Sequence, residues 1–403
     1  MGVESNQDKQ KEYDVLIMGG LGHIGLPLGL IFAKKGLEVC LLDIDRNKAE
    51  SVLKGHMPFI EYGADTILKE VLEKKTLKIS MNKKDISKAK NVIVTLGTEV
   101  DEYFNPQTKK LMDSIMDIKD YLDPTQTLIM RSTVYPTLCR QLSKRLDGIS
   151  IAYCPERIAE GYAIKEIPEL PQIISGIDER AVKNAKELFD KISPKTIETT
   201  VEEAELIKLF TNSWRYLQFA ISNQFYSMAK KLENDGVDYN RIRKAMADGY
   251  ERMYLLPRAG FVGGPCLLKD TLQLKAFDNG HFLLGYSAMM VNESLPNFVV
   301  ENLSRLHNLN KKKVGILGMA FKADVDDIRD SLSYKLVKLL DFHGAKVSCS
   351  DEFIKDPNFI SKEDLIKNNE IIIVATPHSV YKNLEIPQNT YLIDLWGITE
   401  KNN

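Results

Sequence analysis

A glycine-rich stretch at residues 257–270, Pro-Arg-Ala-Gly-Phe-Val-Gly-Gly-Pro-Cys-Leu-Leu-Lys-Asp, holds the side chains best suited to covalent chemistry. Because its glycines and prolines continue neither a helix nor a central strand, we expect a shaped loop. Gly263 and Gly264 allow positive φ and a close approach by another molecule. Cys266 follows, and the cation of Lys269 favours the thiolate, which is the nucleophile. A turn that buries a small cysteine is the alternative, but the dense glycines and nearby charges favour a working thiol.

Length, composition and net charge limit the class of protein. The chain has 403 residues, which is too long for one ordinary core, so we expect about two or three domains. It is 44% hydrophobic and 27% charged, which is typical of soluble proteins, and its formal net charge is -2. We therefore expect no nucleic-acid partner. No apolar run approaches the length of a membrane span, so we expect no membrane association.

The cysteines and the first residues indicate a cellular compartment. The five cysteines are Cys40, Cys139, Cys154, Cys266 and Cys349. They are odd in number, widely spaced and without a Cys-x-x-Cys pair, which is typical of a reducing cytosol and not of disulfides or a metal site. Residues 1–12 are polar and mixed in charge, unlike a signal peptide. We expect a cytoplasmic protein without a bound metal.

The amino-terminal third has the pattern of a dinucleotide site. An apolar run at 13–18 predicts a buried strand, and a second one at 37–42 ends at Asp43. The loop between them carries Gly-x-Gly-x-x-Gly at Gly20, Gly22 and Gly25, followed by a helical pattern. A tight turn without a ligand is the alternative, but strand, glycine loop, helix, strand and acid in this order favour a dinucleotide.

Each of these residues has a physical role in such a site. Gly20 makes the tight turn, Gly22 lets the backbone approach a pyrophosphate, and Gly25 lets helix and strand pack closely. His23 and Ile24 lie in the same loop and belong to the expected cofactor site, where the helix N-terminus faces the phosphates.

The acid at the end of the second strand selects the cofactor. Asp43 can accept from both ribose hydroxyls and repels a 2′-phosphate, so we expect NAD and not NADP. Arg46 and Lys48 would suit NADP, but they lie past the strand end and are interpreted as solvated helix charges.

Small hydroxyls follow two further predicted strands. Thr98 follows the strand at 91–96, and Ser132 and Thr133 follow the strand at 127–131. Strand carboxyl ends are where this type of sheet binds ligands, so these three residues are expected cofactor contacts. Each could equally cap the next helix.

The segment 151–161 is a strand that enters a turn at Pro155. Glu156, Arg157 and Glu160 then lie close together. They are candidate site residues, and a surface cluster of ion pairs is the alternative.

The longest helical pattern runs from residue 202 to 233. Lys208 and Asn212 share one of its faces, and Arg215 lies close by. A solvated stripe is the alternative, but Asn212 in mid-helix opposes helix propensity and indicates a site. Arg252 lies just before the cysteine loop, and a solvated, exposed arginine is one interpretation of it.

The carboxy-terminal third predicts a second open parallel sheet. One strand is expected within residues 311–322, between a basic turn and a small loop, and others at 346–350, 370–376 and 391–394. The loop after the first strand reads Gly-Met-Ala-Phe-Lys and then Asp-Asp-Ile-Arg-Asp-Ser. It lacks Gly-x-Gly-x-x-Gly, so we expect no second dinucleotide.

Taken in order, these motifs resemble the nucleotide-sugar 6-dehydrogenases, the UDP-glucose and UDP-N-acetylhexosamine dehydrogenase family. The resemblance rests on Gly-Gly-x-Cys, Ser-Thr-Val, Cys-Pro-Glu-Arg, Lys-x-x-x-Asn and Gly-x-Ala-Phe-Lys, and it extends over essentially the whole chain after residue 13. It is closest to the UDP-N-acetyl-D-mannosamine dehydrogenase type. Gly97-Thr98 replaces the family's Thr-Pro, and Ser331-Leu332 replaces its Ser-Pro.

The resemblance implies an α/β architecture of two Rossmann-like, doubly wound parallel sheets joined by a central helical region. The expected divisions are residues 1–200, which bind NAD, residues 201–305, which contain the cysteine loop, and residues 306–403, which bind the UDP-sugar. A homodimer through the central helices is implied as well.

The resemblance also implies a four-electron, NAD-dependent oxidation of a UDP-sugar at C6, for polysaccharide biosynthesis. Cys266 would form the thiohemiacetal and thioester, and Lys208 and Asn212 would stabilise the oxyanion. Glu160, Asp270 and Thr133 would help water release the acid. The implied substrate contacts are Glu156, Arg157, Lys208, Asn212, Arg215, Arg252, Gly263, Phe321, Lys322 and Arg329.

Several readings of the function stay open. Cys-Pro-Glu-Arg and Asn-Ser-Trp-Arg favour a UDP-N-acetylhexosamine, whereas Lys269-Asp270-Thr271 and Glu160 favour UDP-glucose. A two-electron NAD dehydrogenase would need no thiol and no second α/β domain. A non-catalytic NAD-binding regulator would tolerate the loss of Cys266 and Lys208, yet both are present.

Overall fold

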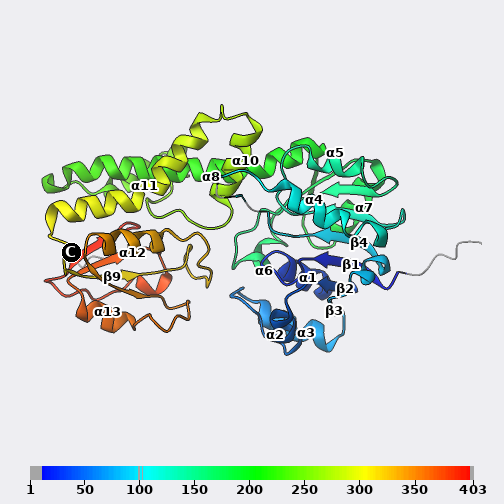
Figure 1. Ribbon diagram of the computed structural model, residues 1–403, viewed down its shortest axis with the longest axis horizontal. Helices are drawn as coiled ribbons and strands as arrows, with labels where there is room; N and C mark the ends of the chain where they lie inside the picture. The colour runs from blue at the N-terminus through cyan, green and yellow to red at the C-terminus, as the bar shows by residue number, and fades with distance from the viewer. Residues whose placement is uncertain (1–10, 99, 102, 400–403) are drawn as a thin grey trace, which may run out of the picture. The chain divides into compact units, whose positions relative to one another are not determined.

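The computed structural model describes residues 11–98, 100–101 and 103–399 (Figure 1). The polar amino-terminal segment therefore lies mostly outside the described residues. The chain divides into two compact units, residues 1–209 and 210–403. Each unit is described by itself.

The first unit is built on an eight-stranded sheet. Its strands are β1 (Tyr13–Met18), β2 (Val39–Leu42), β3 (Leu77–Ser80), β4 (Ala89–Val94), β5 (Thr127–Met130), β6 (Ser150–Tyr153), β7 (Gln172–Gly176) and β8 (Thr196–Glu198). They lie in the order β3-β2-β1-β4-β5-β6-β7-β8. All neighbours are parallel except β6 and β7, which are antiparallel. The sheet therefore changes direction once, near one edge.

Helices cover both faces of this sheet (Figure 1). They are α1 (Gly25–Lys34), α2 (Arg46–Leu53), α3 (Ala64–Glu73), α4 (Thr108–Met116), α5 (Leu138–Ser143), α6 (Ala163–Glu166) and α7 (Glu179–Phe189). Short 3-10 helices are η1 (Lys83–Lys88) and η2 (Lys119–Tyr121). Val15 and Ile17 of β1 pack into one apolar core, and Leu16 and Met18 pack into the other. Burial on both faces explains why β1 is a continuous apolar run.

The second unit combines long helices with a four-stranded sheet (Figure 1). α8 (Val201–Ala229) begins in the first unit and continues into the second. The other elements are η3 (Lys230–Asp235), α9 (Tyr239–Ala247), η4 (Glu251–Met253), α10 (Leu267–Phe277), α11 (Leu283–Leu306), β9 (Lys313–Leu317), α12 (Leu332–Phe342), β10 (Lys346–Ser350), α13 (Lys362–Asn368), β11 (Ile371–Val374), η5 (Ser379–Tyr381) and β12 (Tyr391–Asp394). The strand order is β10-β9-β11-β12, and every pair is parallel.

The expected central helix is shorter than its sequence pattern. α8 ends at Ala229, and a 3-10 helix continues to Asp235. Gly236 then takes a left-handed conformation, with φ of 76°, and ends the helical segment. No helix among the described residues is long and apolar enough to cross a membrane.

The topology determines where ligands can bind. In the first sheet the chain leaves β1 toward β2 on one side and reaches β4 on the other. In the second sheet β9 has the same position between β10 and β11. Loops that follow β1 and β9 therefore lie at the switch points, where open α/β sheets bind nucleotides. The predicted fold class, two Rossmann-like sheets with a central helical region, is confirmed.

Candidate active site

The glycine loop after β1 owes its sequence to close packing. A Cβ on Gly25 would lie 2.4 Å from the Gly19 carbonyl oxygen, and a Cβ on Gly20 would lie 2.8 Å from the Ile17 carbonyl oxygen. A Cβ on Gly22 would meet only the Gly19 oxygen, at an ordinary 3.4 Å. The left-handed residue of the turn is Gly19, with φ of 75°. The sequence pattern assigned the tight turn to Gly20, but the left-handed residue shows that the turn begins at Gly19. Gly22 leaves open space for a ligand.

The start of α1 is suited to a phosphate. Ile24 occupies the N-cap position, and its side chain makes no capping hydrogen bond. The first turn of α1 contains no acidic residue. The N–H groups and the positive end of the helix dipole can therefore serve a pyrophosphate.

Asp43 follows β2 and faces the same loop. Its Oδ2 accepts from the Leu21 N–H at 2.9 Å, and its Oδ1 accepts from the Ile44 N–H at 2.8 Å. These bonds hold the half-buried carboxylate at the rim of the glycine loop. An acid at this place fits a ribose with two hydroxyls, as in NAD.

His23 brings a predicted catalytic residue to the glycine loop. Its ring lies over the ring of Phe59, with centroids 4.0 Å apart. Its Nδ1 lies 3.2 Å from Oε1 of Glu160, which comes from the turn after β6. Both side chains are partly exposed. The structure thus places Glu160 beside the expected dinucleotide site.

The hydroxyl residues at the strand ends differ in their surroundings. Ser132 is buried, and its hydroxyl donates to the Leu96 carbonyl at 2.6 Å, which ties the end of β5 to the end of β4. Thr133 and Thr98 are both partly exposed. Their contacts to a cofactor remain a prediction.

A buried ion pair supports the turn after β6. Arg131, at the end of β5, donates to a carboxylate oxygen of Glu156, and the exposed fractions of the two side chains are 0% and 6%. The same guanidinium donates to the Cys154 carbonyl at 3.0 Å and to Oε1 of Gln172 at 2.9 Å. It also lies 4.8 Å above the ring of Phe189. Sequence reasoning missed Arg131, whose only signal is a charge at the end of an apolar strand.

This pairing gives Glu156 a role in positioning. Its other oxygen accepts from the backbone N–H groups of Arg157, at 2.7 Å, and Ile158, at 3.0 Å. The guanidinium of Arg157 donates to the Pro171 carbonyl. The buried carboxylate therefore fixes the turn that carries Glu160, while substrate contacts of Glu156 and Arg157 remain a prediction.

In the second unit, two asparagines hold the cysteine loop. The Asn223 side chain of α8 accepts from the Gly260 N–H at 2.8 Å and donates to the Gly260 carbonyl at 3.1 Å. It also donates to Asn292 of α11 at 2.9 Å. Both asparagines are fully buried, so the bonds are well shielded. Sequence reasoning missed them, although buried asparagines within apolar helices are a usable signal.

Cys266 occupies the N-cap position of α10 and is exposed. One helical turn along α10, the Asp270 N–H donates to the Cys266 carbonyl at 2.9 Å, and Oδ2 of Asp270 accepts from the Asn212 amide of α8 at 2.6 Å. Nζ of Lys269 lies 3.5 Å from Oδ1 of Asp270, which is fully buried. A helix N-terminus and a nearby lysine both stabilise a thiolate. The predicted residues Cys266, Asn212 and Asp270 are thus brought together.

The other four cysteines have a different environment. Burial raises the pKa of Cys40, Cys154 and Cys349 to about 12. It also raises the pKa of Cys139 well above its ordinary value. Of the five thiols, all within the described residues, Cys266 alone is exposed.

The cationic site candidates on α8 and in the segment before the cysteine loop vary in exposure. Lys208 is half-buried one helical turn before the buried Asn212. Arg215 and Arg252 are exposed. The Arg252 guanidinium donates to the Tyr250 hydroxyl at 3.1 Å. The roles predicted for these cations remain predictions.

The two glycines before Cys266 pack against the loop that follows β9. A Cβ on Gly263 would lie 2.3 Å from the Asp330 carbonyl oxygen. Gly264 has φ of 94°, and a Cβ there would lie 2.4 Å from the Phe321 ring. The Gly264 N–H donates to the Asp330 carbonyl at 3.2 Å. The glycines therefore pack the cysteine loop against the loop after β9. Because this second loop carries the implied substrate contacts Phe321, Lys322 and Arg329, it is called the expected UDP loop.

The expected UDP loop presents cations at its surface. Nε of Arg329 donates to both carboxylate oxygens of Asp327, at 2.8 and 3.0 Å. The Arg329 side chain is 52% exposed, whereas that of Asp327 is 6% exposed. The buried acid thus orients the exposed guanidinium, and Lys322 lies partly exposed on the same loop.

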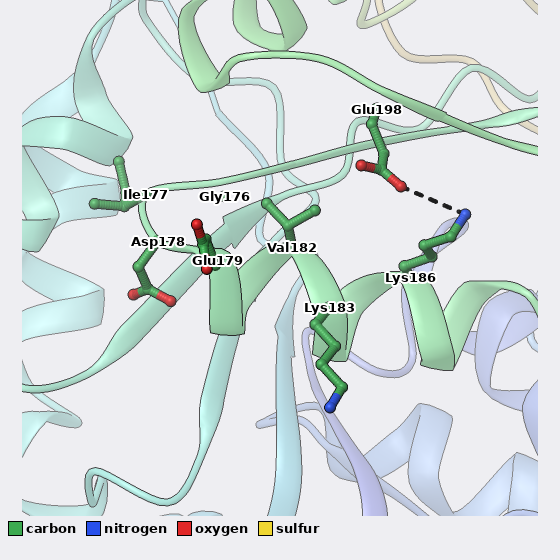
Figure 2. A pocket seen from close by; sticks show the side chains of 8 residues that line it. All are labelled: Gly176, Ile177, Asp178, Glu179, Val182, Lys183, Lys186 and Glu198. Atoms are coloured by element: carbon green, nitrogen blue, oxygen red, sulfur yellow. Dashed lines mark ion pairs between the residues drawn. The ribbon is translucent and has the colours of Figure 1, made fainter.

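The lining of a groove beside β7 and α7 includes none of these residues (Figure 2). Its lining comprises Gly176, Ile177, Asp178, Glu179, Val182, Lys183, Lys186 and Glu198. Figure 2 shows Lys186 paired with Glu198, whose charged atoms are 3.5 Å apart. It contains no predicted site residue and is open to solvent, so we do not assign it a catalytic role.

Protein-family comparison finds three matches, and all belong to the UDP-glucose/GDP-mannose dehydrogenase family. The NAD binding domain matches residues 14–193, the central domain matches residues 202–293, and the UDP binding domain matches residues 315–401. Together they cover most of the chain, in the order that the motifs predict.

Individual relatives agree with these matches. UDP-N-acetyl-D-mannosamine dehydrogenase of Methanocaldococcus jannaschii is 29% identical over 377 residues, which are 91% of this chain and 86% of the relative. UDP-glucose 6-dehydrogenase of Rickettsia felis is 25% identical over 393 residues, with 91% and 87% covered. The solved structure of a UDP-D-ManNAc dehydrogenase from Pyrococcus horikoshii has a TM-score of 0.88 and 26% identity, with 96% of each chain covered.

Proposed function

The chain belongs to the UDP-glucose/GDP-mannose dehydrogenase family, and on this premise we propose that it oxidises C6 of UDP-N-acetyl-D-mannosamine to the carboxylate through a covalent bond to Cys266. It is an NAD-dependent nucleotide-sugar dehydrogenase. The observation that carries the covalent route is the single exposed thiol at the start of α10, beside the buried pair of Asn212 and Asp270.

The reaction removes two hydrides from one carbon. NAD⁺, which the glycine loop and Asp43 would hold, would supply the acceptor for both hydrides. The first oxidation converts the C6 alcohol to an aldehyde and releases a proton. The Cys266 thiolate then adds to the carbonyl carbon, and the resulting thiohemiacetal loses the second hydride to become a thioester. Water cleaves the thioester, which yields the carboxylate and restores the thiol.

Asn212 is suited to bind the oxyanion that forms at C6. A side-chain amide has two N–H donors, and one of them engages the buried carboxylate of Asp270. That bond fixes the plane of the amide, so the second donor has a defined direction before the substrate binds. Lys208, one helical turn away on α8, would supply the positive charge. We therefore assign oxyanion binding to Asn212 and Lys208.

Among the candidates for the base, Glu160 is the most suitable. Asp270 is fully buried and already bound by Asn212, so it is suited to orienting that amide. Glu160 is partly exposed beside the glycine loop, where a water can reach it. Thr133 is also partly exposed and can donate a hydrogen bond to that water.

The loop after β9 is suited to the UDP moiety. The guanidinium of Arg329, oriented by Asp327, and the ammonium of Lys322 would neutralise the diphosphate. The ring of Phe321 packs against Gly264, two residues before Cys266. A uridine bound at Phe321 would therefore lie on a loop that is in contact with the cysteine loop. This arrangement supports a UDP-sugar in this unit.

Motifs and relatives support UDP-N-acetylmannosamine as the first candidate for the sugar. Cys-Pro-Glu-Arg at 154–157 favours an N-acetylhexosamine, and the Methanocaldococcus relative carries the name of the mannosamine enzyme. UDP-glucose is the second candidate, because Glu160 is present and the Rickettsia relative is a UDP-glucose 6-dehydrogenase. The product would be a precursor for polysaccharide biosynthesis.

An apolar face on α8 supports a homodimer. Five side chains at helical spacing, Phe210, Trp214, Ile221, Phe225 and Met228, are each 39 to 56% exposed. They form one stripe along a helix of the central region, and a second copy of this chain is the proposed occupant. Phe225→Glu combined with Met228→Glu should shift the protein from dimer to monomer in sedimentation velocity. The control Lys183→Glu, at a 73% exposed position of α7 in the first unit, makes the same change in net charge and should stay dimeric; a monomeric wild type would refute the dimer.

The substrate panel tests the proposed reaction. NADH formed per sugar consumed is measured with UDP-N-acetylmannosamine, UDP-N-acetylglucosamine and UDP-glucose. We expect two NADH per molecule of the mannosamine substrate, and none from Cys266→Ala. Cys349→Ala, which removes a half-buried thiol, is the matched control and should stay active. One NADH per sugar would refute the four-electron route and leave a simple alcohol dehydrogenase.

A further inference from the structure

A fully buried histidine, His378, joins three loops at the carboxyl ends of the second sheet. It follows β11, and its ring packs against Phe353, after β10, with centroids 4.7 Å apart. The Tyr381 ring meets it edge-on at 5.4 Å. Sequence analysis gave this residue no role, and the reaction above does not use it.

The hydrogen bonds of His378 define its tautomer. The Asp324 N–H donates to Nδ1 at 2.9 Å, so Nδ1 carries no proton. Nε2 therefore carries the proton of the neutral ring and donates it to Oδ2 of Asp351 at 3.0 Å. Oδ1 of Asp324 in turn accepts from the Ser379 N–H at 2.8 Å. The imidazole is thus fixed on both sides.

Asp351 continues this network to the other end of the same loop. Its Oδ2 accepts from the N–H groups of Met319, at 2.6 Å, and Ala320, at 2.9 Å. The pair of His378 and Asp351 therefore binds the loop just before Phe321 and again at Asp324. Phe321 and Lys322 lie between the two attachment points.

The second attachment point holds a conformation that the chain does not favour by itself. Asp324 has φ of 57°, in the left-handed region. Such a residue persists only when its surroundings enforce the geometry. The acceptor nitrogen of His378 and the Ser379 N–H provide that enforcement.

We propose that His378 is a positioning residue for UDP binding, which clamps the segment between Ala320 and Asp324 so that Phe321 and Lys322 are pre-arranged for the nucleotide. This inference rests on the proposed function of that loop. His378 would act through the loop and not by touching the substrate, because its side chain is fully buried. Pre-arrangement raises affinity because the ordering cost is met before the ligand arrives.

Two variants separate the two hydrogen bonds. His378→Asn keeps an acceptor oxygen close to the position of Nδ1, and so keeps the bond from Asp324. His378→Gln keeps a donor toward Asp351 and loses that acceptor. Loss of one hydrogen bond that orders the loop should weaken binding about five- to tenfold. His343→Gln, at an exposed histidine of the same unit, is the matched control.

Calorimetric titration of the full-length protein with UDP, and separately with NAD⁺, tests the proposal. We expect His378→Gln to bind UDP about five- to tenfold more weakly, while His378→Asn stays within about twofold of wild type. The Kd of NAD⁺ should not change in any variant. In turnover, His378→Gln should raise KM for the UDP-sugar and leave kcat unchanged.

The outcomes separate this inference from the proposed function. If wild type fails to bind UDP, the function proposed for the loop is wrong. If wild type binds UDP and His378→Gln binds it equally well, the positioning role is refuted. Equal weakening in both variants, with NAD⁺ affinity lost as well, would also refute it, because it would indicate a general packing role.

Discussion

The two sheets of this protein place an acid at the same topological position and use it differently. Asp43 follows β2 and Asp351 follows β10; each accepts from the backbone of the loop after the first strand of its sheet. Asp43 stays half-buried at the rim of its loop. The Asp351 side chain is fully buried and bonded to His378. Asp43 is therefore accessible to a ribose, as we propose, whereas Asp351 holds its loop in place.

The helix after the first strand of each sheet, α1 or α12, differs in the same way. α1 begins at Gly25 without a side-chain cap, so its N-terminus can serve a pyrophosphate. α12 is capped by Ser331, whose hydroxyl accepts from the Ser333 N–H at 3.3 Å. In the second sheet, we propose that the cations of Lys322 and Arg329 bind the anionic ligand instead. One topology can thus provide a dinucleotide site or a UDP site. The difference is whether the acid and the helix N-terminus already have hydrogen-bond partners within the protein.

The largest expected effect breaks the first site alone. Gly25→Val places a side chain where a Cβ would already lie 2.4 Å from the Gly19 carbonyl oxygen. We expect NAD⁺ affinity to fall by about a hundredfold or more, because the loop can no longer close around the pyrophosphate. UDP affinity should stay unchanged, since the second sheet has its own core. Calorimetry with both ligands measures this. Gly36→Asn, at an open position with φ of 86° that asparagine tolerates, is the control.

The next effect addresses the anchor of the second sheet. Asp351→Ala leaves buried N–H groups and the His378 ring without their acceptor. We expect a loss of about 3 kcal/mol in the free energy of unfolding of this unit, measured by denaturant titration. Asp43→Ala, at the equivalent but half-buried position, should cost far less stability. Equal losses in the two variants would contradict the contrast between the acids.

A smaller effect concerns ligand selection at Asp43. Asp43→Ala removes the acceptor for the ribose hydroxyls and the charge that repels a 2′-phosphate. NAD⁺ should bind about tenfold more weakly, and NADP⁺ should bind more tightly than it does to wild type. Asp351→Asn should leave both affinities as they are. Unchanged discrimination between the cofactors in Asp43→Ala would argue against its ribose role.

The smallest effect is a pH dependence of stability. Burial opposes ionisation of Asp351, but the hydrogen bond from His378 and the backbone N–H donors outweigh it, so the pKa of this carboxyl lies below its ordinary value of 3.8. Its contribution to stability is therefore fully present above about pH 4 and is lost as the pH falls toward the lowered pKa. Between pH 5 and 3, wild type should lose about 1 kcal/mol more stability than Asp351→Asn, as followed by denaturant titration. Parallel curves would refute the stabilising interaction.

Local patterns made much of this structure predictable from the sequence. The apolar run of β1, the glycine loop and Asp43 lie close together in the chain, so spacing alone indicated their arrangement. The same holds for the cysteine loop, where glycines and prolines mark the break before α10. The helical pattern of the sequence runs to residue 233, and the helical segment ends close to that point, at the left-handed Gly236.

Long-range pairings could not be predicted in this way. Arg131 and Glu156 are distant in sequence, and nothing local specifies that they meet in the core. The bonds of Asn223 to Gly260 and the bond of His378 to Asp351 have the same character. Gly263 and Gly264 were interpreted as room for another molecule, whereas their nearest neighbours are Asp330 and Phe321 of the same unit. Tertiary packing decided these contacts.

The covalent role of Cys266 is tested most directly by trapping the intermediate. In Glu160→Gln, water attack should slow while both oxidations proceed, so the thioester should accumulate during turnover with NAD⁺ and UDP-N-acetylmannosamine. Peptide mass spectrometry after acid quenching should find the uronyl adduct on Cys266 and on no other cysteine. Two NADH per sugar without any adduct, or an adduct on another residue, would contradict a thioester at this loop.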